Sequence, residues 1–246
     1  MGTVLFVVLT RVTVDTHNVN LVPSVIVLGS FLIPLAFVMY VHERATEVPL
    51  TVVLGCFATG GILGVTAASV LEYRTVLELG ALPTIAIGLS EESAKLVIPL
   101  VIFATGRYRR EADGLLFGVA SGMGFAAFET MGYGLTALLY SHGRIGYVEQ
   151  LLFVRGLLAP AGHAAWTGLI CAMLWRARER PGARSAIALA AAFIVAVLLH
   201  ALWDSLSTVR EEALVGVVGF ALLAWRIHVA KREVYREAPM RAVEPG

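Results

Sequence analysis

The sequence has few charged side chains and only two cysteines. Asp, Glu, Lys and Arg make up 15% of its 246 residues, whereas a soluble globular domain is about 25% charged. Hydrophobic residues reach 58%, and the mean hydropathy is +0.79. This shortage of charge excludes an ordinary soluble domain and indicates a protein that crosses a membrane several times.

The sequence also lacks metal-binding cysteine clusters and nucleic-acid patches. Cys56 and Cys171 lie in separate apolar segments without the close spacing of a zinc site, so we interpret them as helix-packing residues. The Lys and Arg residues flank apolar runs instead of forming a patch, and we therefore expect no nucleic-acid partner.

Seven apolar stretches approach or exceed the roughly 20 residues that a membrane-spanning helix needs. Their ranges are 19–41, 48–71, 79–105, 114–140, 149–175, 185–207 and 213–227. We predict an all-α, polytopic membrane helix bundle of seven transmembrane helices, with one domain over residues 1–246. Residues 1–14 are apolar but short, and they form either an interfacial stretch or an eighth helix. The polar residues 230–246 are predicted to be a cytoplasmic tail.

Positive charge is distributed unevenly between the connections. About thirteen of the 19 Lys and Arg residues fall in one set of alternate connections and the C-terminal tail, and about four fall in the other set. Because Lys and Arg collect on the cytoplasmic side of a membrane, we predict an outside N-terminus and an inside C-terminus.

Ionisable residues interrupt four of the predicted spans. With the predicted orientation, they fall at one level in the outer half of the membrane, within roughly two helical turns of each other. They are Glu91, Glu92, Lys95, Glu129, His163, His200 and Asp204. Because such residues almost always face a bundle interior or a water-filled cavity, we predict that they line one polar cavity.

Spacing within the spans supports this prediction. The pairs Glu91 and Lys95, Phe125 and Glu129, and His200 and Asp204 are each four residues apart, and residues four apart share a helix face. A carboxylate in such a cavity can act as a general base on water. An imidazole can stabilise an oxyanion or bind a metal.

Three short motifs resemble those of the PrsW family of bacterial intramembrane proteases. They are EESAK at 91–95, FAAFE at 125–129 and HALWD at 200–204, which fit the family patterns EExxK, FxxxE and HxxxD. The resemblance covers about residues 79–207. It also places the chain in the wider superfamily of CAAX prenyl proteases and Abi (CPBP) proteins. That group usually has His and Asn at the positions of Glu129 and Asp204, so these two residues favour PrsW.

The resemblance implies an endopeptidase of the bacterial plasma membrane that makes a site-1 cleavage in an anti-sigma factor. The expected partner is therefore a membrane-anchored protein substrate, and the sequence does not specify the oligomeric state. We expect Glu91 to be the general base and Glu129 to share its water. Asp204 would orient His200 or an adjacent water. Lys95 would pair with Glu91 or Glu92 and lower the cost of burying charge, while Glu92 would face a neighbouring helix.

The motifs leave the metal question open. Glu129, His163 and His200 could together hold a divalent metal, zinc being the first choice, because three such ligands are common in catalytic zinc sites. However, the sequence has no HExxH motif, and a metal-free, glutamate-type mechanism is the alternative.

Other functions and roles also stay open at this point. A non-proteolytic membrane scaffold would need no acids, and a small-molecule or proton transporter could use the same cavity. A transporter more often shows repeated halves, and the sequence shows no such symmetry. For Arg155, snorkelling outward is the first interpretation, and binding of a substrate carboxylate is the alternative. The glycines Gly114, Gly118 and Gly122 form a small-xxx-small pattern that predicts close helix packing.

Overall fold

The computed structural model describes residues 1–45, 47–158 and 160–241, and of residues 230–241 only the backbone path. Every regular element in these ranges is helical. The elements are α1 (Gly2–Thr16), η1 (Val19–Leu21), α2 (Val22–Ala45), α3 (Leu50–Leu79), α4 (Thr84–Lys95), α5 (Val97–Ala104), α6 (Glu111–Tyr140), α7 (Ile145–Leu158), η2 (Pro160–Ala164), α8 (Ala165–Glu179), α9 (Ala183–Ser205) and α10 (Val209–Arg241).

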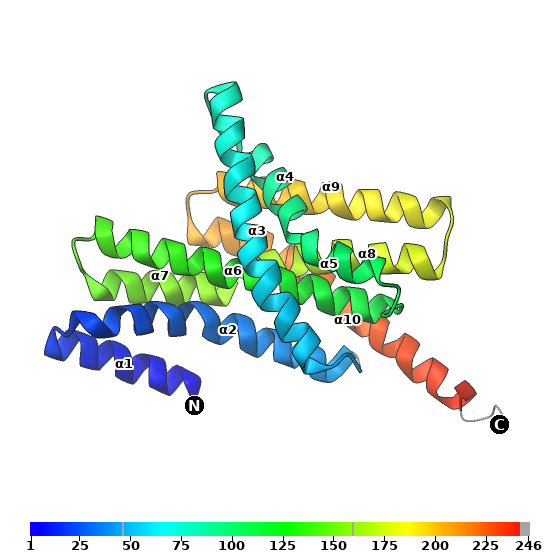
Figure 1. Ribbon diagram of the computed structural model, residues 1–246, viewed down its shortest axis with the longest axis horizontal. Coiled ribbons are helices and arrows are strands. Elements are labelled where there is room, and N and C mark those ends of the chain that lie inside the picture. The colour runs from blue at the N-terminus through cyan, green and yellow to red at the C-terminus, as the bar shows by residue number, and fades with distance from the viewer. Residues whose placement is uncertain (46, 159, 242–246) are drawn as a thin grey trace.

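Helix α6 is the centre of the bundle. Helices α2, α6, α7, α8 and α9 run roughly along the long axis of the molecule, whereas α3 crosses them at a steep angle (Figure 1). Every residue of α6 from Glu111 to Ala127 is buried, and the largest apolar core cluster contains many of them. Helices α2, α3, α7 and α8 pack directly on α6, whereas α9 packs on α8 and α4, and α1 packs on α2.

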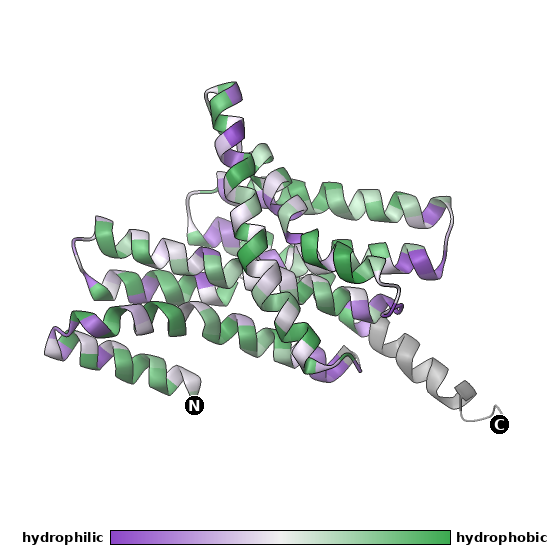
Figure 2. Cartoon of the chain, viewed as in Figure 1, coloured by the Kyte–Doolittle hydropathy of each residue, from purple (hydrophilic) through white to green (hydrophobic). Residues whose placement is uncertain are grey.

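Six helical segments are long and apolar enough to cross a membrane, judged by length and composition over the described residues. They are Val19–Arg44, Leu50–Leu79, Glu111–Tyr140, Ile145–Glu179, Ala183–Ser205 and Val209–Val229. Apolar residues extend along these helices, and hydrophilic residues gather at several of their ends (Figure 2). The chain is thus a multi-pass membrane protein with an all-helical fold, and these six segments match six of the seven predicted spans.

The predicted span 79–105 is not one helix but two short ones, α4 and α5. Pro99 has no N–H with which to bond the carbonyl of Lys95, four residues earlier, and a proline also crowds that carbonyl. The helix breaks at Leu96, between the two elements. The hydroxyl of Ser121 on α6 donates to the Lys95 carbonyl at 2.6 Å instead. The break therefore anchors α4 to α6 at the position where α4 carries its charges.

The predicted span 149–175 is also interrupted. Helix α7 ends at Leu158, and the π-helical segment η2 precedes α8. Pro160 begins η2, and it cannot donate the backbone hydrogen bond of a regular helix. Short π-helical turns often occur at functional sites, and this one carries His163.

Both ends of the described chain are helical beyond the spans predicted from the sequence. Residues 1–14, left open as an interfacial stretch or an eighth helix, belong to α1, which packs on α2 but is too short to count among the six candidate spans. The predicted tail 230–246 begins inside α10, which continues to Arg241. Residues 242–246 lie outside the described part of the chain.

The glycine pattern on α6 lets the backbone of α8 and η2 approach closely. A Cβ atom added at Gly114, Gly118 or Gly122 would lie 2.7, 2.5 or 2.3 Å from the carbonyl oxygen of Cys171, Thr167 or His163, respectively. Any side chain at these positions would push the two helices apart. This confirms the close packing that the pattern predicted, and it sets the distance of His163 from α6.

Helix α3 approaches α6 in the same way. A Cβ atom at Gly124 would lie 2.0 Å from the carbonyl oxygen of Phe57, and one at Gly61 would lie 2.6 Å from the backbone of Gly124. By contrast, a Cβ atom at Gly132, further along α6, would meet no atom within 4 Å. Gly124 is therefore required by the fold, whereas Gly132 is not.

We expect Gly124→Ala to destabilise the protein by about 1–3 kcal/mol, the usual cost of overpacking a core, because the methyl group meets backbone rather than a flexible side chain. Thermal unfolding in a single detergent would measure the effect. Gly132→Ala is the matched control on the same helix and should unfold at or slightly above the wild-type temperature. Equal stability of the two variants would contradict the packing described for α3 and α6.

Candidate active site

The site is built around a completely buried lysine on α4. Lys95 Nζ lies 3.1 Å from Glu91 Oε2 and 2.8 Å from Glu92 Oε1, and the lysine side chain is 0% exposed. The spacings of four and three residues place both carboxylates over the ammonium on one helix face. The ring of Phe125 on α6 covers the ammonium, with its centroid 4.2 Å from Nζ. The phenylalanine of the FAAFE motif thus helps to hold the lysine of the EESAK motif.

Glu92 is also 0% exposed, and three side chains bind its carboxylate. In addition to Lys95, Thr167 Oγ1 donates to Oε2 at 3.0 Å, and His200 Nδ1 lies 2.9 Å from Oε1. An ionised carboxylate only accepts hydrogen bonds, so the Nδ1 atom of His200 carries the proton. Glu92 therefore sets the tautomer and the ring orientation of His200.

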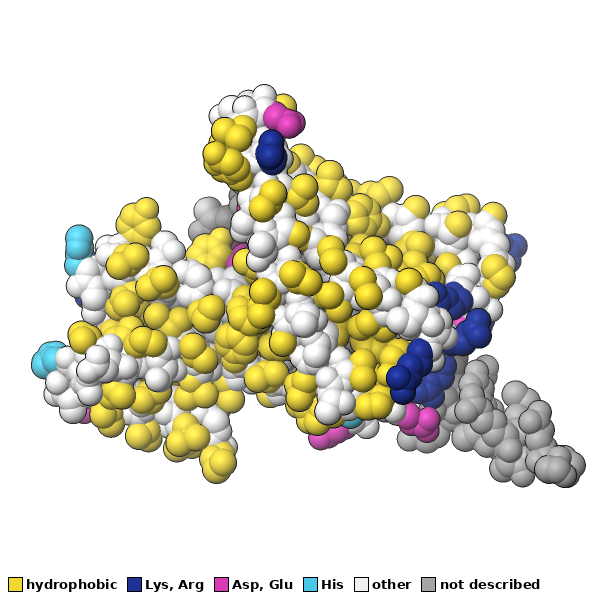
Figure 3. Space-filling model, viewed as in Figure 1, with side chains coloured by type: hydrophobic (Ala, Val, Ile, Leu, Met, Phe, Trp, Pro, Cys, Tyr) yellow, Lys and Arg dark blue, Asp and Glu magenta, His cyan; other side chains and the backbone are white. Residues whose placement is uncertain are grey.

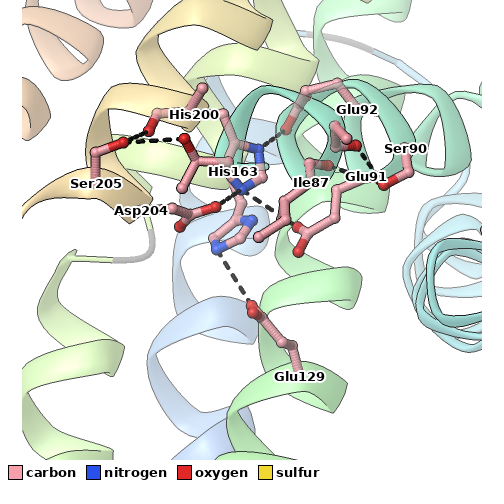
Figure 4. A network of polar contacts seen from close by, with 12 residues as sticks. Ile87, Ser90, Glu91, Glu92, Glu129, His163, His200, Asp204 and Ser205 are labelled. Atoms are coloured by element: carbon pink, nitrogen blue, oxygen red, sulfur yellow. Dashed lines mark hydrogen bonds and ion pairs between the residues drawn. The ribbon is translucent and has the colours of Figure 1, made fainter. Parts of the chain in front are cut away.

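The other nitrogen of His200 faces two carboxylates. His200 Nε2 lies 3.4 Å from Glu91 Oε2 and 3.6 Å from Asp204 Oδ2. Figure 4 shows these side chains converging from α4 and α9. The ring of Trp166 packs against His200 with centroids 4.8 Å apart. Glu92 and Trp166 thus fix the ring orientation of His200, and its Nε2 atom faces Glu91 and Asp204.

Glu129 reaches the same place from α6. Its Oε2 atom lies 3.4 Å from His163 Nε2, and Arg155 Nη2 on α7 donates to that oxygen at 2.8 Å. Arg155 also donates from Nε to Thr130 and stacks its guanidinium over the ring of Tyr133. Arg155 therefore points into the bundle and holds Glu129. The interpretation that it snorkels outward is wrong, because a carboxylate within the bundle attracts it more strongly.

Three potential metal ligands form a compact group. Ligand atoms of Glu91, Glu129 and His163 all lie within 4.8 Å of one another. Two carboxylates and an imidazole are a donor set that suits a catalytic zinc site. The group shares Glu129 and His163 with the predicted metal set, but Glu91 takes the place of His200, whose Nδ1 is engaged by Glu92. The chain thus offers a metal-binding arrangement without the HExxH motif.

The structure brings all the predicted site residues together. Glu91, Glu92, Lys95, Phe125, Glu129, His163, His200 and Asp204 each contact at least one other member of the set. Sequence reasoning missed Thr167, and it assigned Arg155 an outward instead of an inward orientation. Thr167 lies four residues after His163, a helical spacing that could have indicated it. Arg155 stands within an apolar span, which is itself a sign of function.

A cavity of about 400 Å³ borders the site. Helices α6 to α10 all contribute to its walls. Among its lining residues, His163 contacts Glu129 and Trp166 packs on His200, while Tyr133, Tyr147 and Trp203 supply aromatic surface. The cavity is therefore large enough for side chains of a second molecule to reach the imidazole of His163.

The comparison with protein-family models decides the family. A model described as PrsW family intramembrane metalloprotease matches residues 48–229, which is more than half of the chain and includes every residue of the site. The chain belongs to the PrsW family. Within this family it is an intramembrane metalloprotease, which favours the protease prediction over the scaffold and transporter alternatives.

A curated relative agrees with the family. The protein named Protease PrsW from Shouchella clausii (strain KSM-K16) is 25% identical over 200 residues, covering 78% of this chain and 87% of that protein. No solved structure matches the chain. The family match over residues 48–229 contains all three PrsW motifs of the chain.

Removing the charge of Lys95 should be far more damaging than removing that of Arg155. We expect Lys95→Met to cost about 3–5 kcal/mol of stability, because it leaves two buried carboxylates without their cation. Arg155→Met should cost less, since the Arg155 and Glu129 side chains are 28% and 19% exposed. Thermal unfolding of both variants in the same detergent is the measurement. A milder effect of Lys95→Met than of Arg155→Met would contradict the central role of this lysine.

Proposed function

We propose that the protein makes a site-1 type cleavage in a single-pass anti-sigma factor of a bacterial plasma membrane. The observation that supports this most is the convergence of Glu91, Glu129 and His163 on one point, inside a PrsW family protease. Carboxylates and an imidazole around one point can bind and activate the water that attacks a peptide carbonyl.

In this proposal the water lies among Glu91, Glu129 and His163. Glu91 keeps its predicted role and accepts the first proton from the water. Glu91 Oε2 is well placed for this role, because it faces both the ligand group and His200 Nε2 at 3.4 Å. Arg155 holds Glu129 toward His163, and the cavity beside His163 admits the substrate chain.

His200 then moves the proton to the leaving amine. Its Nδ1 proton stays on the Glu92 side, and Nε2 can accept a proton from Glu91 and release it again. The resulting imidazolium would be stabilised by Asp204, 3.6 Å from Nε2, and would attract the negative charge of the tetrahedral oxyanion. Because Glu92 keeps a proton on Nδ1, only Nε2 of His200 is available to accept and release the transferred proton.

A divalent metal fits this arrangement. Glu129 and His163 would hold it, and zinc is the first choice for such donors. Glu91, the third member of the group, would remain the base that accepts the proton. When bound, the metal polarises the substrate carbonyl and activates the water. His200 would then lie beside the metal group without belonging to it, which differs from the ligand set predicted from the sequence.

The charge distribution supports the predicted orientation. Lys and Arg side chains gather at one end of the molecule, near the α5–α6 and α8–α9 connections (Figure 3). If this end is cytoplasmic, α4 and α5 together make the seventh crossing, with α4 in the outer half. Cleavage would then occur toward the outer face.

Alanine at Glu91, Glu129 or His200 should reduce cleavage at least about 100-fold, because general acid–base catalysis contributes about 10²–10⁴-fold. Membrane proteins from cells that express wild type or Glu91→Ala can be compared for fragments, and the fragment pair identifies the substrate and the cleavage site.

Glu78→Ala is the matched control, since Glu78 is an exposed acid at the end of α3. It should cleave as wild type does. Wild-type rates for Glu91→Ala at normal protein level would contradict the proposed mechanism, and an absence of any wild-type-dependent fragment would contradict the proposed protease function.

Metal analysis can separate the two ligand sets. We expect Glu129→Ala and His163→Ala to lose the bound metal, whereas His200→Ala should retain it while losing activity. Elemental analysis of purified variants, with chelation and zinc restoration of the wild type, measures this. Loss of metal from His200→Ala would support the set predicted from the sequence instead, and full activity after chelation would contradict the metal-dependent proposal.

A further inference from the structure

A second and larger cavity lies outside the site. It has a volume of about 1290 Å³ and is bounded by α1, the start of α2 and the α6–α7 hairpin. Its inner wall is mostly apolar, with Val22, Ile26, Leu135 and Leu138 among its lining residues. We call it the outer groove, because it opens at the end of the molecule opposite the basic connections.

The outer groove meets the cavity of the active site. Tyr147 and Gln150, both on α7, line both spaces. They lie one helical turn apart along α7 and form the boundary between the two. A molecule bound in the outer groove can therefore reach the neighbouring cavity that His163 lines.

Two glycines in the outer groove have no packing role within the described part of the chain. Gly132 on α6 and Gly146 on α7 line the groove, and a Cβ atom at either would meet nothing within 4 Å. Gly132 lies inside α6, where glycine costs about 1 kcal/mol relative to alanine, and Gly146 lies in the first turn of α7. Neither residue has the positive φ that would require glycine. Small residues on a membrane helix allow another backbone to approach closely.

The mouth of the groove is polar. His17 and Asn18 from the α1–η1 connection, and His142 and Arg144 from the α6–α7 connection, line it at one end. Polar and cationic side chains of this kind lie at the membrane–water interface. The groove therefore runs from the interface into the apolar layer and then to the active site.

We propose that the outer groove binds the outer half of the substrate's transmembrane helix and feeds the adjoining extended segment into the site cavity. This deepens the proposed function and rests on it. A helix fits the groove better than a lipid, because the open glycines on two neighbouring helices favour backbone contact and the groove leads directly to the reacting groups. The interfacial end would hold the substrate where its helix meets water.

Filling the groove tests the proposal. Gly132→Leu and Gly146→Leu should reduce cleavage of the anchored substrate, identified by its Glu91-dependent fragments, at least about tenfold. Cleavage of a short quenched fluorescent peptide that spans the mapped site should stay unchanged, because the peptide needs only the site cavity. Gly55→Leu is the matched control: Gly55 is an exposed helical glycine of α3, also with nothing within 4 Å of a Cβ atom, and it should cleave both substrates normally.

Undiminished cleavage of the anchored substrate by both groove variants would overturn the proposal, and so would an equal loss for the peptide and the anchored substrate. These outcomes leave the proposed function intact, since the wild type still cleaves. Failure of the protease function would appear instead as fragments that persist in Glu91→Ala.

Cross-linking supplies a second measurement that does not depend on turnover. A photoreactive benzoylphenylalanine in place of Leu135 or Leu139, which are exposed and already line the groove with large side chains, should cross-link to the transmembrane segment of the same substrate in the Glu91→Ala background. The same residue in place of Leu63, an exposed leucine of α3, should not. Cross-links to a second copy of this chain, or to lipid alone, would identify another occupant and overturn the proposal.

Discussion

The cost of burying the ammonium of Lys95 determines how the site is arranged. A charge removed from water must be paired and hydrogen-bonded, and Lys95 meets this requirement with two carboxylates and an aromatic ring. Those partners cannot move independently afterwards. Because Glu92 also binds His200 and Thr167, α4, α8 and α9 are held together through one charged centre.

Backbone contact brings these charges within reach of each other. The glycines of α6 let carbonyl oxygens of α8 and η2 approach it directly, and the break at Leu96 turns α4 so that Ser121 can bind the Lys95 carbonyl. A helix separation larger by one methyl group would move His163 away from Glu129, which is already at 3.4 Å. Helix α6 therefore provides both the glycines that allow close packing and the carboxylate of Glu129 that contacts His163.

Much of this arrangement could be predicted from local patterns. Apolar length indicated seven spans, and six of them match helical segments that are long and apolar enough to cross a membrane. The spacing of ionisable residues indicated one cavity. The breaks at Leu96 and at Pro160 were not predicted, because a proline within an apolar run is compatible with a kinked helix as well as with two helices. The contacts of Thr167 and Arg155 were missed for another reason: each depends on which face of α7 and α8 turns toward Glu129 and Glu92, and that is set by packing between helices distant in sequence.

The adjacent acids Glu91 and Glu92 show how a helix can separate two functions. Successive residues point about 100° apart, so the two carboxylates share Lys95 but face different surroundings. Glu92 is enclosed and has each oxygen occupied by a donor, which suits it to orient His200 without taking part in proton transfer. Glu91 has the same cation on one side and the ligand group of Glu129 and His163 on the other. In the proposed mechanism, the acid with fewer fixed partners is therefore the one that changes its protonation, and the acid with more partners holds the histidine in position to receive the proton.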